Sequence, residues 1–127
     1  MIVAGIGCRR GTPPEEIEDV IKRALTAFGL AGGRPDLIAT EASKADEPGV
    51  VDAARRMAVS LFACTADEMR AAAHRALTVS ERVAAMKGVP SVAETAAIVA
   101  AGRDARLLGP RIATRSATCA IAVGEGR

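Results

Sequence analysis

The chain has 127 residues, a natural length for one domain, and its 17 basic residues nearly balance its 15 acidic residues. Half of the residues are apolar, but 28 are alanine and only two are aromatic, so neither base stacking nor sequence-independent binding of nucleic acid is expected. The three cysteines form no Cys-x-x-Cys pair, which indicates neither a disulfide framework nor a metal site and favours a reduced, cytoplasmic compartment. The sequence shows no charged leader and no apolar run of roughly 20 residues, so we expect a soluble protein that does not enter a membrane.

The first expected elements are a buried strand and an amphipathic helix, joined by a short turn. Residues 2–6 are almost all apolar, and apolar residues recur at helical spacing over residues 17–28 with charged residues between them. Thr12 suits the N-cap, Pro13 the first helical position, and Glu15 the reciprocal member of a capping box. The sequence therefore predicts a helix that begins directly after a glycine-rich turn.

Strand and helix patterns continue to alternate along the rest of the chain. Strands are expected at 37–40, 59–64 and 117–123, extended segments at 106–108 and 112–113, and helices starting near Pro48, Thr65, Ser80 and Ser91, the second and fourth with a Glu68 or Glu94 capping-box partner. This alternation predicts one three-layer α/β domain over residues 1–127. Its sheet should be mostly parallel or mixed, with about five strands, flanking helices and antiparallel pairing near the end.

The turn after the first strand has the composition of an anion site. It contains Gly7, Cys8, Arg9, Arg10, Gly11 and Thr12. A helix start offers unpaired N–H groups and the positive end of its dipole, and arginine adds a forked, permanently charged donor for carboxylate or phosphate. The alternative is an ordinary strand-to-helix turn with two solvated arginines. In that case Glu15 already bonds the free N–H groups at the start of the helix.

A second polar loop, residues 41–49, follows the second expected strand. In open α/β sheets, ligands bind beyond the carboxyl ends of the strands, so this loop should share an edge with the first turn. Lys44 is suited to bind a ligand carboxylate, and Asp46 or Glu47 is suited to act as a base or to hold a water. In the alternative interpretation, Asp46 or Glu47 caps the helix that starts at Pro48 and Lys44 is solvated.

A third candidate lies at residues 88–94, where Ser91 precedes another helix start; an ordinary cap is the alternative. His74, the only histidine, has no metal-ligand spacing around it and is expected to be structural or merely exposed. Cys8 beside Arg9 could have thiolate character, although a small buried residue at a strand end is the commoner case. The opening Gly-Ile-Gly lacks the third glycine of a dinucleotide fingerprint, and no metal or cofactor is predicted.

Several short motifs, taken in order, resemble the family formed by the cobalamin-biosynthesis protein CobE and the C-terminal domain of CbiG, the cobalt-precorrin-5A hydrolase. The motifs lie at residues 5–12, 44–49, 80–83 and 88–94. The resemblance runs from residue 1 to about residue 123 and implies a compact α/β domain in cobalamin biosynthesis. The intermediates of that pathway are macrocycles with many acetate and propionate carboxylates, which suits arginine, lysine and helix N-termini around a strand-end cleft.

The resemblance leaves three functional hypotheses. In the first, the protein binds a precorrin or corrinoid intermediate as an accessory or carrier protein, with Arg9, Arg10 and Lys44 as anion contacts and the turn's backbone as donor. In the second, it opens a precorrin lactone, with Asp46 or Glu47 positioning water and Arg9 stabilising negative charge. In the third, it is a non-catalytic subunit that docks on another pathway enzyme. CbiG-type hydrolases carry an additional N-terminal region, and this chain starts at the first strand, so binding is the preferred hypothesis.

Overall fold

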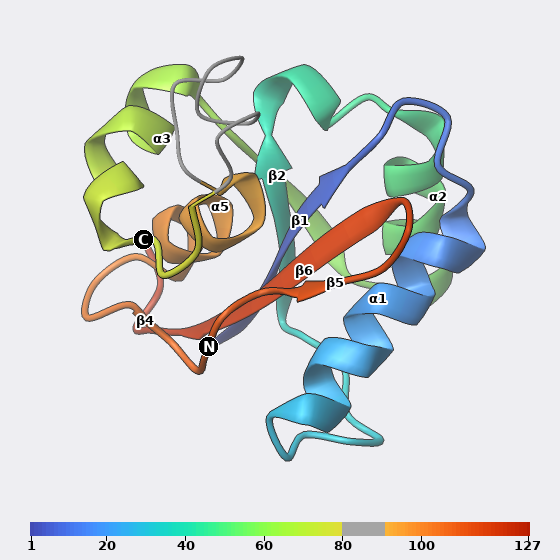
Figure 1. Ribbon diagram of the computed structural model, residues 1–127, viewed down its shortest axis with the longest axis horizontal. Helices are drawn as coiled ribbons and strands as arrows, with labels where there is room; N and C mark the ends of the chain where they lie inside the picture. The colour runs from blue at the N-terminus through green and yellow to red at the C-terminus, as the bar shows by residue number, and fades with distance from the viewer. Residues whose placement is uncertain (80–90) are drawn as a thin grey trace.

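The computed structural model describes residues 1–79 and 91–127, and Figure 1 shows their arrangement. The elements are β1 (Ile2–Cys8), α1 (Pro14–Ala27), β2 (Leu37–Glu41), η1 (Ala42–Lys44), α2 (Pro48–Met57), β3 (Ser60–Cys64), α3 (Ala66–Ala72), η2 (Ala73–Arg75), α5 (Val92–Ala101), β4 (Arg106–Leu107), β5 (Ile112–Ala113) and β6 (Ala117–Val123). The helix start expected at Ser80 and the turn expected at residues 88–90 lie outside the described residues.

The strands form one six-stranded mixed sheet in the order β3-β2-β1-β6-β4, and β5 also pairs with β6. The first three strands in the chain are parallel to one another. Strand β6 then runs antiparallel to β1 along its whole length, from Ile2 opposite Val123 to Cys8 opposite Ala117. Strands β4 and β5 pair antiparallel with β6, so the antiparallel pairing expected near the end of the sequence is confirmed.

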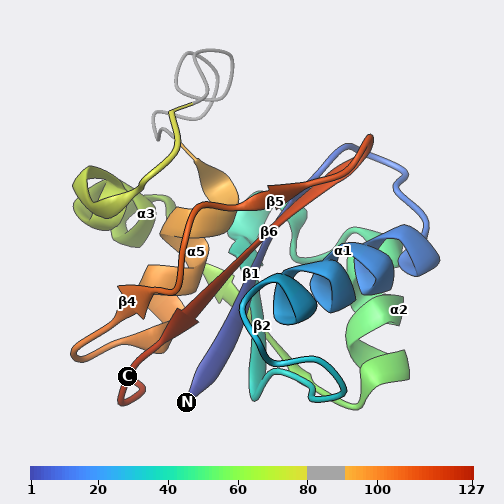
Figure 2. The same ribbon diagram turned by 60° about the horizontal axis from the view of Figure 1, so that its bottom comes forward.

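Helices cover both faces of this sheet, which confirms the three-layer prediction. Helices α1 and α2 pack on one face, and α3 and α5 lie on the other (Figures 1 and 2). The α1 face is filled by large aliphatic side chains such as Ile17, Ile21 and Ile38, all fully buried. The α5 face is filled mostly by alanine. The two layers of the core are therefore built from side chains of different size.

Glycine lets α5 lie directly on β1. A Cβ placed on Gly5 would lie 2.0 Å from the carbonyl oxygen of Ala93 and 2.7 Å from the amide nitrogen of Ala97. No side chain fits at that distance, so the helix approaches the strand through backbone contact. This approach also brings the start of α5 to the end of β1, where a Cβ on Gly7 would lie 3.6 Å from the Cβ of Val92.

The two ends of the strands form opposite edges of the sheet, and different parts of the chain lie at each edge. Strands β1, β2 and β3 end at Cys8, Glu41 and Cys64, and the loops after them share one edge, as the sequence predicted. At the opposite edge the Met1 ammonium donates to the carbonyl of Gly124 at 3.0 Å, and the Gly124 amide donates back at 3.1 Å.

The carboxyl end of the chain folds back onto β3 and α3. The Arg127 guanidinium lies 4.6 Å from the centroid of the Phe62 ring and forms an ion pair with Glu68. A cation over a ring face is attracted by the ring quadrupole, so both contacts hold this end against the domain.

Candidate functional site

The turn between β1 and α1 closes on itself in a way that differs from the sequence prediction. Helix α1 starts at Pro14 with Pro13 at the N-cap, and no side chain caps it. The Thr12 hydroxyl instead donates to the carbonyl of Arg9 at 2.8 Å. The Glu15 carboxylate accepts from its own backbone N–H and then from Arg56, and both contacts lower the pKa of Glu15. The predicted Thr12–Glu15 capping box is therefore wrong, because the helix starts later and Glu15 bonds elsewhere.

Most backbone donors of this turn already have partners inside the protein. The Arg9 amide donates to the carbonyl of Ser116 at 3.1 Å, and the Thr12 amide donates to the carbonyl of Arg9 at 3.3 Å. The amide of Gly11, a residue with φ of +80°, donates to the carboxylate of Glu47. An anion that approaches the turn must therefore be bound mainly by side chains.

The structure brings the first turn and the 41–49 loop together, as the strand-end rule predicted. Glu47 is the N-cap residue of α2, but its carboxylate bonds the Gly11 amide instead of capping the helix. A Cβ on Gly49 would lie 1.9 Å from the carbonyl oxygen of Thr12, so the start of α2 touches the turn directly. Asp46 is exposed, and no hydrogen bond or ion pair of its side chain is found within residues 1–79 and 91–127.

Cys8 and Lys44 lie in the same neighbourhood. Burial raises the pKa of the half-buried Cys8 thiol, and the positive charge of Lys44 offsets part of this rise while Glu47 and Glu41 add to it. A raised pKa means that the thiol form prevails at neutral pH. The thiolate interpretation of Cys8 is therefore not supported, and the strand-end interpretation is.

Ser91 and Glu94, predicted to form a capping box, form only half of one. The Ser91 hydroxyl accepts from the Glu94 amide at 3.4 Å, but the Glu94 carboxylate turns away from the helix end. It is fully buried and accepts hydrogen bonds from the Leu77 amide (2.8 Å), the Thr78 amide (2.7 Å) and hydroxyl (2.8 Å), and the Arg111 amide (2.9 Å). Glu94 thus fastens two distant segments to the start of α5, a role that local sequence spacing did not reveal.

His74 lies exposed on η2. Within the described ranges, no three His, Cys, Asp or Glu side chains gather in a way that could hold a metal ion. Nor is any helix in those ranges both long enough and apolar enough to cross a membrane.

Arginines on the helices and arginines at the strand-end edge have different surroundings. On the helices, Arg23 pairs with Asp19 at 2.7 Å and Arg56 pairs with Glu15 at 3.0 Å. At the edge, Arg9 and Arg10 are exposed, and the described part of the chain gives their side chains no acidic partner. Among the described residues, these two arginines are therefore cations at the edge that no ion pair holds.

A third arginine, which sequence reasoning did not place, lies beside these two. Arg115 sits in the turn between β5 and β6, and this turn lies next to the β1–α1 turn in both Figure 1 and Figure 2. The neighbouring Ser116 carbonyl accepts from the Arg9 amide, which fixes the contact. We call Arg9, Arg10, Lys44 and Arg115, together with their turns, the cationic rim. Only the fold could reveal its last member, since Arg115 is remote in sequence from the others.

These features define a compact α/β domain with a cationic rim at the ends of its parallel strands. A family model described as "Cobalamin synthesis G C-terminus" matches residues 2–122. The chain is also 40% identical over 121 residues to Protein CobE from Sinorhizobium sp., covering 95% of this chain and 79% of that protein. The chain therefore belongs to the family of cobalamin-biosynthesis proteins formed by CobE and the C-terminal domain of CbiG.

Solved structures agree with this assignment. The crystal structure of CobE, described as a protein from the cobalamin (vitamin B12) biosynthetic pathway, matches with a TM-score of 0.90 and 30% identity over 96% of this chain and 92% of that one. The cobalamin biosynthesis protein ChiG from Agrobacterium tumefaciens str. C58 matches with a TM-score of 0.78 and 38% identity over 98% and 99% of the two chains. A cobalamin biosynthesis protein G homolog from Sulfolobus solfataricus matches with a TM-score of 0.67 and 28% identity, over 99% of this chain but 37% of that one.

Proposed function

We propose that this protein binds a carboxylate-rich precorrin or corrinoid intermediate of cobalamin biosynthesis at the cationic rim, as an accessory or carrier protein. The observation that carries the proposal is the pair of exposed arginines, Arg9 and Arg10, which have no acidic partner in the described part of the chain. Guanidinium groups suit carboxylates because their planar fork matches both oxygens.

Three acidic residues near the rim have partners other than the rim arginines. Glu15 pairs with Arg56, and Glu16 accepts from the Ser116 hydroxyl at 2.8 Å. Glu47 accepts from the Gly11 amide. Arg9 and Arg10 are thus left without an acidic partner among residues 1–79 and 91–127, so their donors are available to the carboxylates of a ligand. Family membership supports the choice of ligand, since the acetate and propionate groups of these macrocycles supply several carboxylates at once.

The lactone-hydrolase alternative receives less support from the geometry. It needs Asp46 or Glu47 to hold the attacking water. Glu47 is held by the Gly11 amide, which ties its carboxylate to the turn and away from the role of a free base. Asp46 remains available but is exposed, so its surroundings do not exclude bulk water from a reaction.

The test is a binding titration with the double variant Arg9→Ala/Arg10→Ala and two corrins, cobyrinic acid and cobinamide, in which amides replace the ring's acid side chains. We expect the variant to bind cobyrinic acid roughly tenfold more weakly at low salt, because two solvent-exposed charge contacts are lost. The matched control is Arg103→Ala/Arg106→Ala, which removes the same charge from two exposed arginines at the opposite edge.

Three results would count against the proposal. The wild-type protein could fail to retain cobyrinic acid, the rim variant could bind it as tightly as the wild type, or the control variant could lose as much affinity as the rim variant. Mass spectrometry of the pigment, with an assay for acetaldehyde, belongs in the same experiment and uses a precorrin lactone as substrate. A mass change that is lost in Asp46→Asn would favour the hydrolase.

A further inference from the structure

The turn between β5 and β6 is bonded to the β1–α1 turn after Arg115 and is closed by its own hydrogen bond around Arg115. After it, the Ser116 carbonyl accepts from the Arg9 amide at 3.1 Å and from the Thr12 hydroxyl at 3.4 Å. Before it, the Thr114 amide donates to the carbonyl of Ala117 at 2.8 Å, which closes the turn. The backbone of Arg115 is therefore held in place by hydrogen bonds and not by its own side chain.

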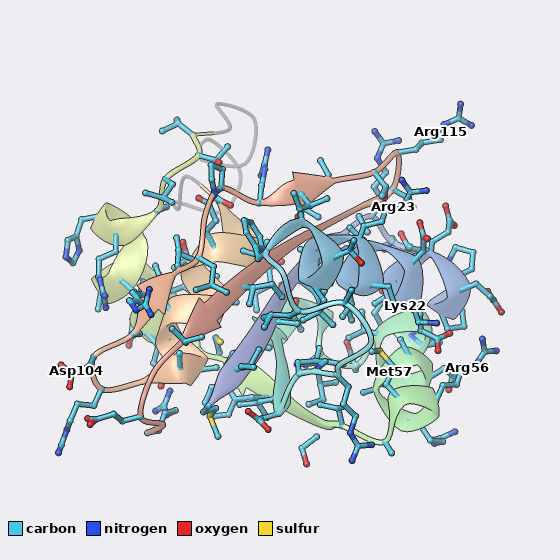
Figure 3. All side chains as sticks on the ribbon, turned by 90° about the horizontal axis from the view of Figure 1, so that it is seen from below. Lys22, Arg23, Arg56, Met57, Asp104 and Arg115 are labelled. Carbon is cyan, nitrogen blue, oxygen red and sulfur yellow. The ribbon has the colours of Figure 1, made fainter. Side chains whose placement is uncertain are left out.

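The Arg115 side chain is exposed and projects from this turn at one end of the molecule, as Figure 3 shows. Within residues 1–79 and 91–127 it has no hydrogen bond and no ion pair. The same turn also binds the Glu16 carboxylate, one oxygen of which accepts from the Ser116 hydroxyl at 2.8 Å. A cation that is positioned by its backbone and lacks a counter-ion has its donors ready for an external anion.

We propose that Arg115 is a third carboxylate contact of the ligand site and makes the site selective for the number of carboxylates that a ligand carries. This inference rests on the proposed function and deepens it. Arg9 and Arg10 come from one turn and Arg115 from a second turn that is hydrogen-bonded to it, so the three residues border one surface from two turns. A ligand gains the contact to Arg115 only if it carries a carboxylate beyond those that Arg9 and Arg10 hold.

The chemistry of the selection follows from charge. A carboxylate accepts two parallel N–H bonds from a guanidinium, whereas a primary amide is neutral and offers one acceptor oxygen together with donors that face the guanidinium donors. Conversion of an acid side chain to an amide should therefore remove the Arg115 contribution while the ring stays the same size. The rim would then prefer the acid form of a macrocycle to its amidated form.

The test compares Arg115→Ala, Arg115→Lys and the control Arg103→Ala in titrations with cobyrinic acid and cobinamide, at low and high salt. Arg103 neighbours Asp104, which lies at the other end of the molecule from Arg115 in Figure 3. We expect Arg115→Ala to weaken binding of cobyrinic acid roughly three- to fivefold at low salt and to reduce the salt dependence, with little effect on cobinamide. Arg115→Lys keeps the charge but loses the forked pair of guanidinium donors, so its affinity for cobyrinic acid should lie between those of the wild type and Arg115→Ala.

The outcomes separate this inference from the proposed function. If wild-type protein does not bind cobyrinic acid, both are overturned. If binding depends on Arg9 and Arg10 but Arg115→Ala binds both corrins as the wild type does, only the role of Arg115 is overturned. If Arg103→Ala lost as much affinity for cobyrinic acid as Arg115→Ala does, the loss would reflect the change in net charge, and the proposed role of Arg115 would also be rejected. Thermal melts of each variant confirm that the comparison is made on folded protein.

Discussion

The two faces of the sheet are packed by opposite strategies. On the α1 face, branched aliphatic side chains such as Ile17 and Ile21 fill the space between helix and strands, and the outer side of the helix carries exposed ion pairs. On the α5 face, alanine and glycine bring backbone against backbone, and the helix is buried on nearly all sides. On the α1 face, a change in size can be absorbed when side chains move. On the α5 face, helix and strand touch through their backbones, so a larger side chain can be accommodated only if the helix itself shifts.

The two faces also differ in how their charged side chains are placed. The ion pairs between α1 and α2 share the Arg56 side chain, which is 46% exposed, so water and salt screen them even though Glu18 is only 19% exposed. The one buried carboxylate of α5, Glu94, accepts from four hydrogen-bond donors in the described part of the chain. We therefore expect stability to respond strongly to small changes on the α5 face and weakly to charge removal on the α1 face.

The largest effect should come from Gly5→Ala on the α5 face. The new Cβ would fall 2.0 Å from the Ala93 carbonyl oxygen, and only a shift of α5 could relieve this contact. We expect a loss of about 3 kcal/mol or more in the free energy of unfolding, measured by urea denaturation. Gly33→Ala is the matched control, because the nearest atom to its Cβ would be the Leu30 carbonyl oxygen at 3.3 Å. Equal stability of the two variants would contradict the backbone-contact description.

A smaller but still large effect is expected for Glu94→Gln. The amide keeps the size of the side chain, but its NH2 group replaces one acceptor oxygen and faces either the amides of Leu77 and Thr78 or the amide of Arg111. Leaving such a buried donor unsatisfied should cost about 1–3 kcal/mol in urea unfolding. Glu125→Gln, at an exposed carboxylate, is the control and should be neutral. A neutral Glu94→Gln would mean that these hydrogen bonds contribute nothing net.

The smallest effect is expected for Arg56→Ala on the α1 face. Arg56 pairs with Glu15 at 3.0 Å and Glu18 at 3.4 Å, but in solvent, so the urea midpoint should stay within experimental error of the wild type. Because the pKa of Glu15 is lowered in the folded state, any contribution is present above its ordinary pKa and is lost as the pH falls through the lowered value. A clear loss at neutral pH would break the contrast between the two faces.

Most elements that depend on neighbouring residues were predicted correctly from sequence, but the Thr12–Glu15 capping box was not. The capping box of α3 forms as expected, with the Thr65 hydroxyl accepting from the Glu68 amide at 3.1 Å and the Glu68 carboxylate accepting from the Thr65 amide at 2.9 Å. The same pattern at Ser91 and Glu94 formed only in part, because donors from two distant segments compete for the carboxylate. Local spacing identifies a potential cap but not the long-range partners that can replace it.

At the candidate site, too, the sequence predicted the local arrangement but not the long-range contacts. The strand-end rule correctly placed the turn with Arg9 beside the loop with Glu47, because parallel strands end at one edge. It could not show that Glu47 would bond the Gly11 amide, 36 residues away, or that Ser116 would bond Thr12, 104 residues away. The first contact depends on how the loop after β2 closes on the first turn, and the second depends on how β6 lies beside β1; no local pattern encodes either.

The pairing of Met1 with Gly124 has a practical meaning for experiments on this protein. The amino terminus leaves the domain at the edge where β1 begins, and the cationic rim lies at the edge where β1 ends. The carboxyl terminus, in contrast, uses the Arg127 side chain to contact Phe62 and Glu68. A sensor surface or dye attached through the amino end would therefore leave the rim facing solution, at the expense of the ammonium contact with Gly124, whereas attachment at the carboxyl end would lie beside the Arg127 contacts.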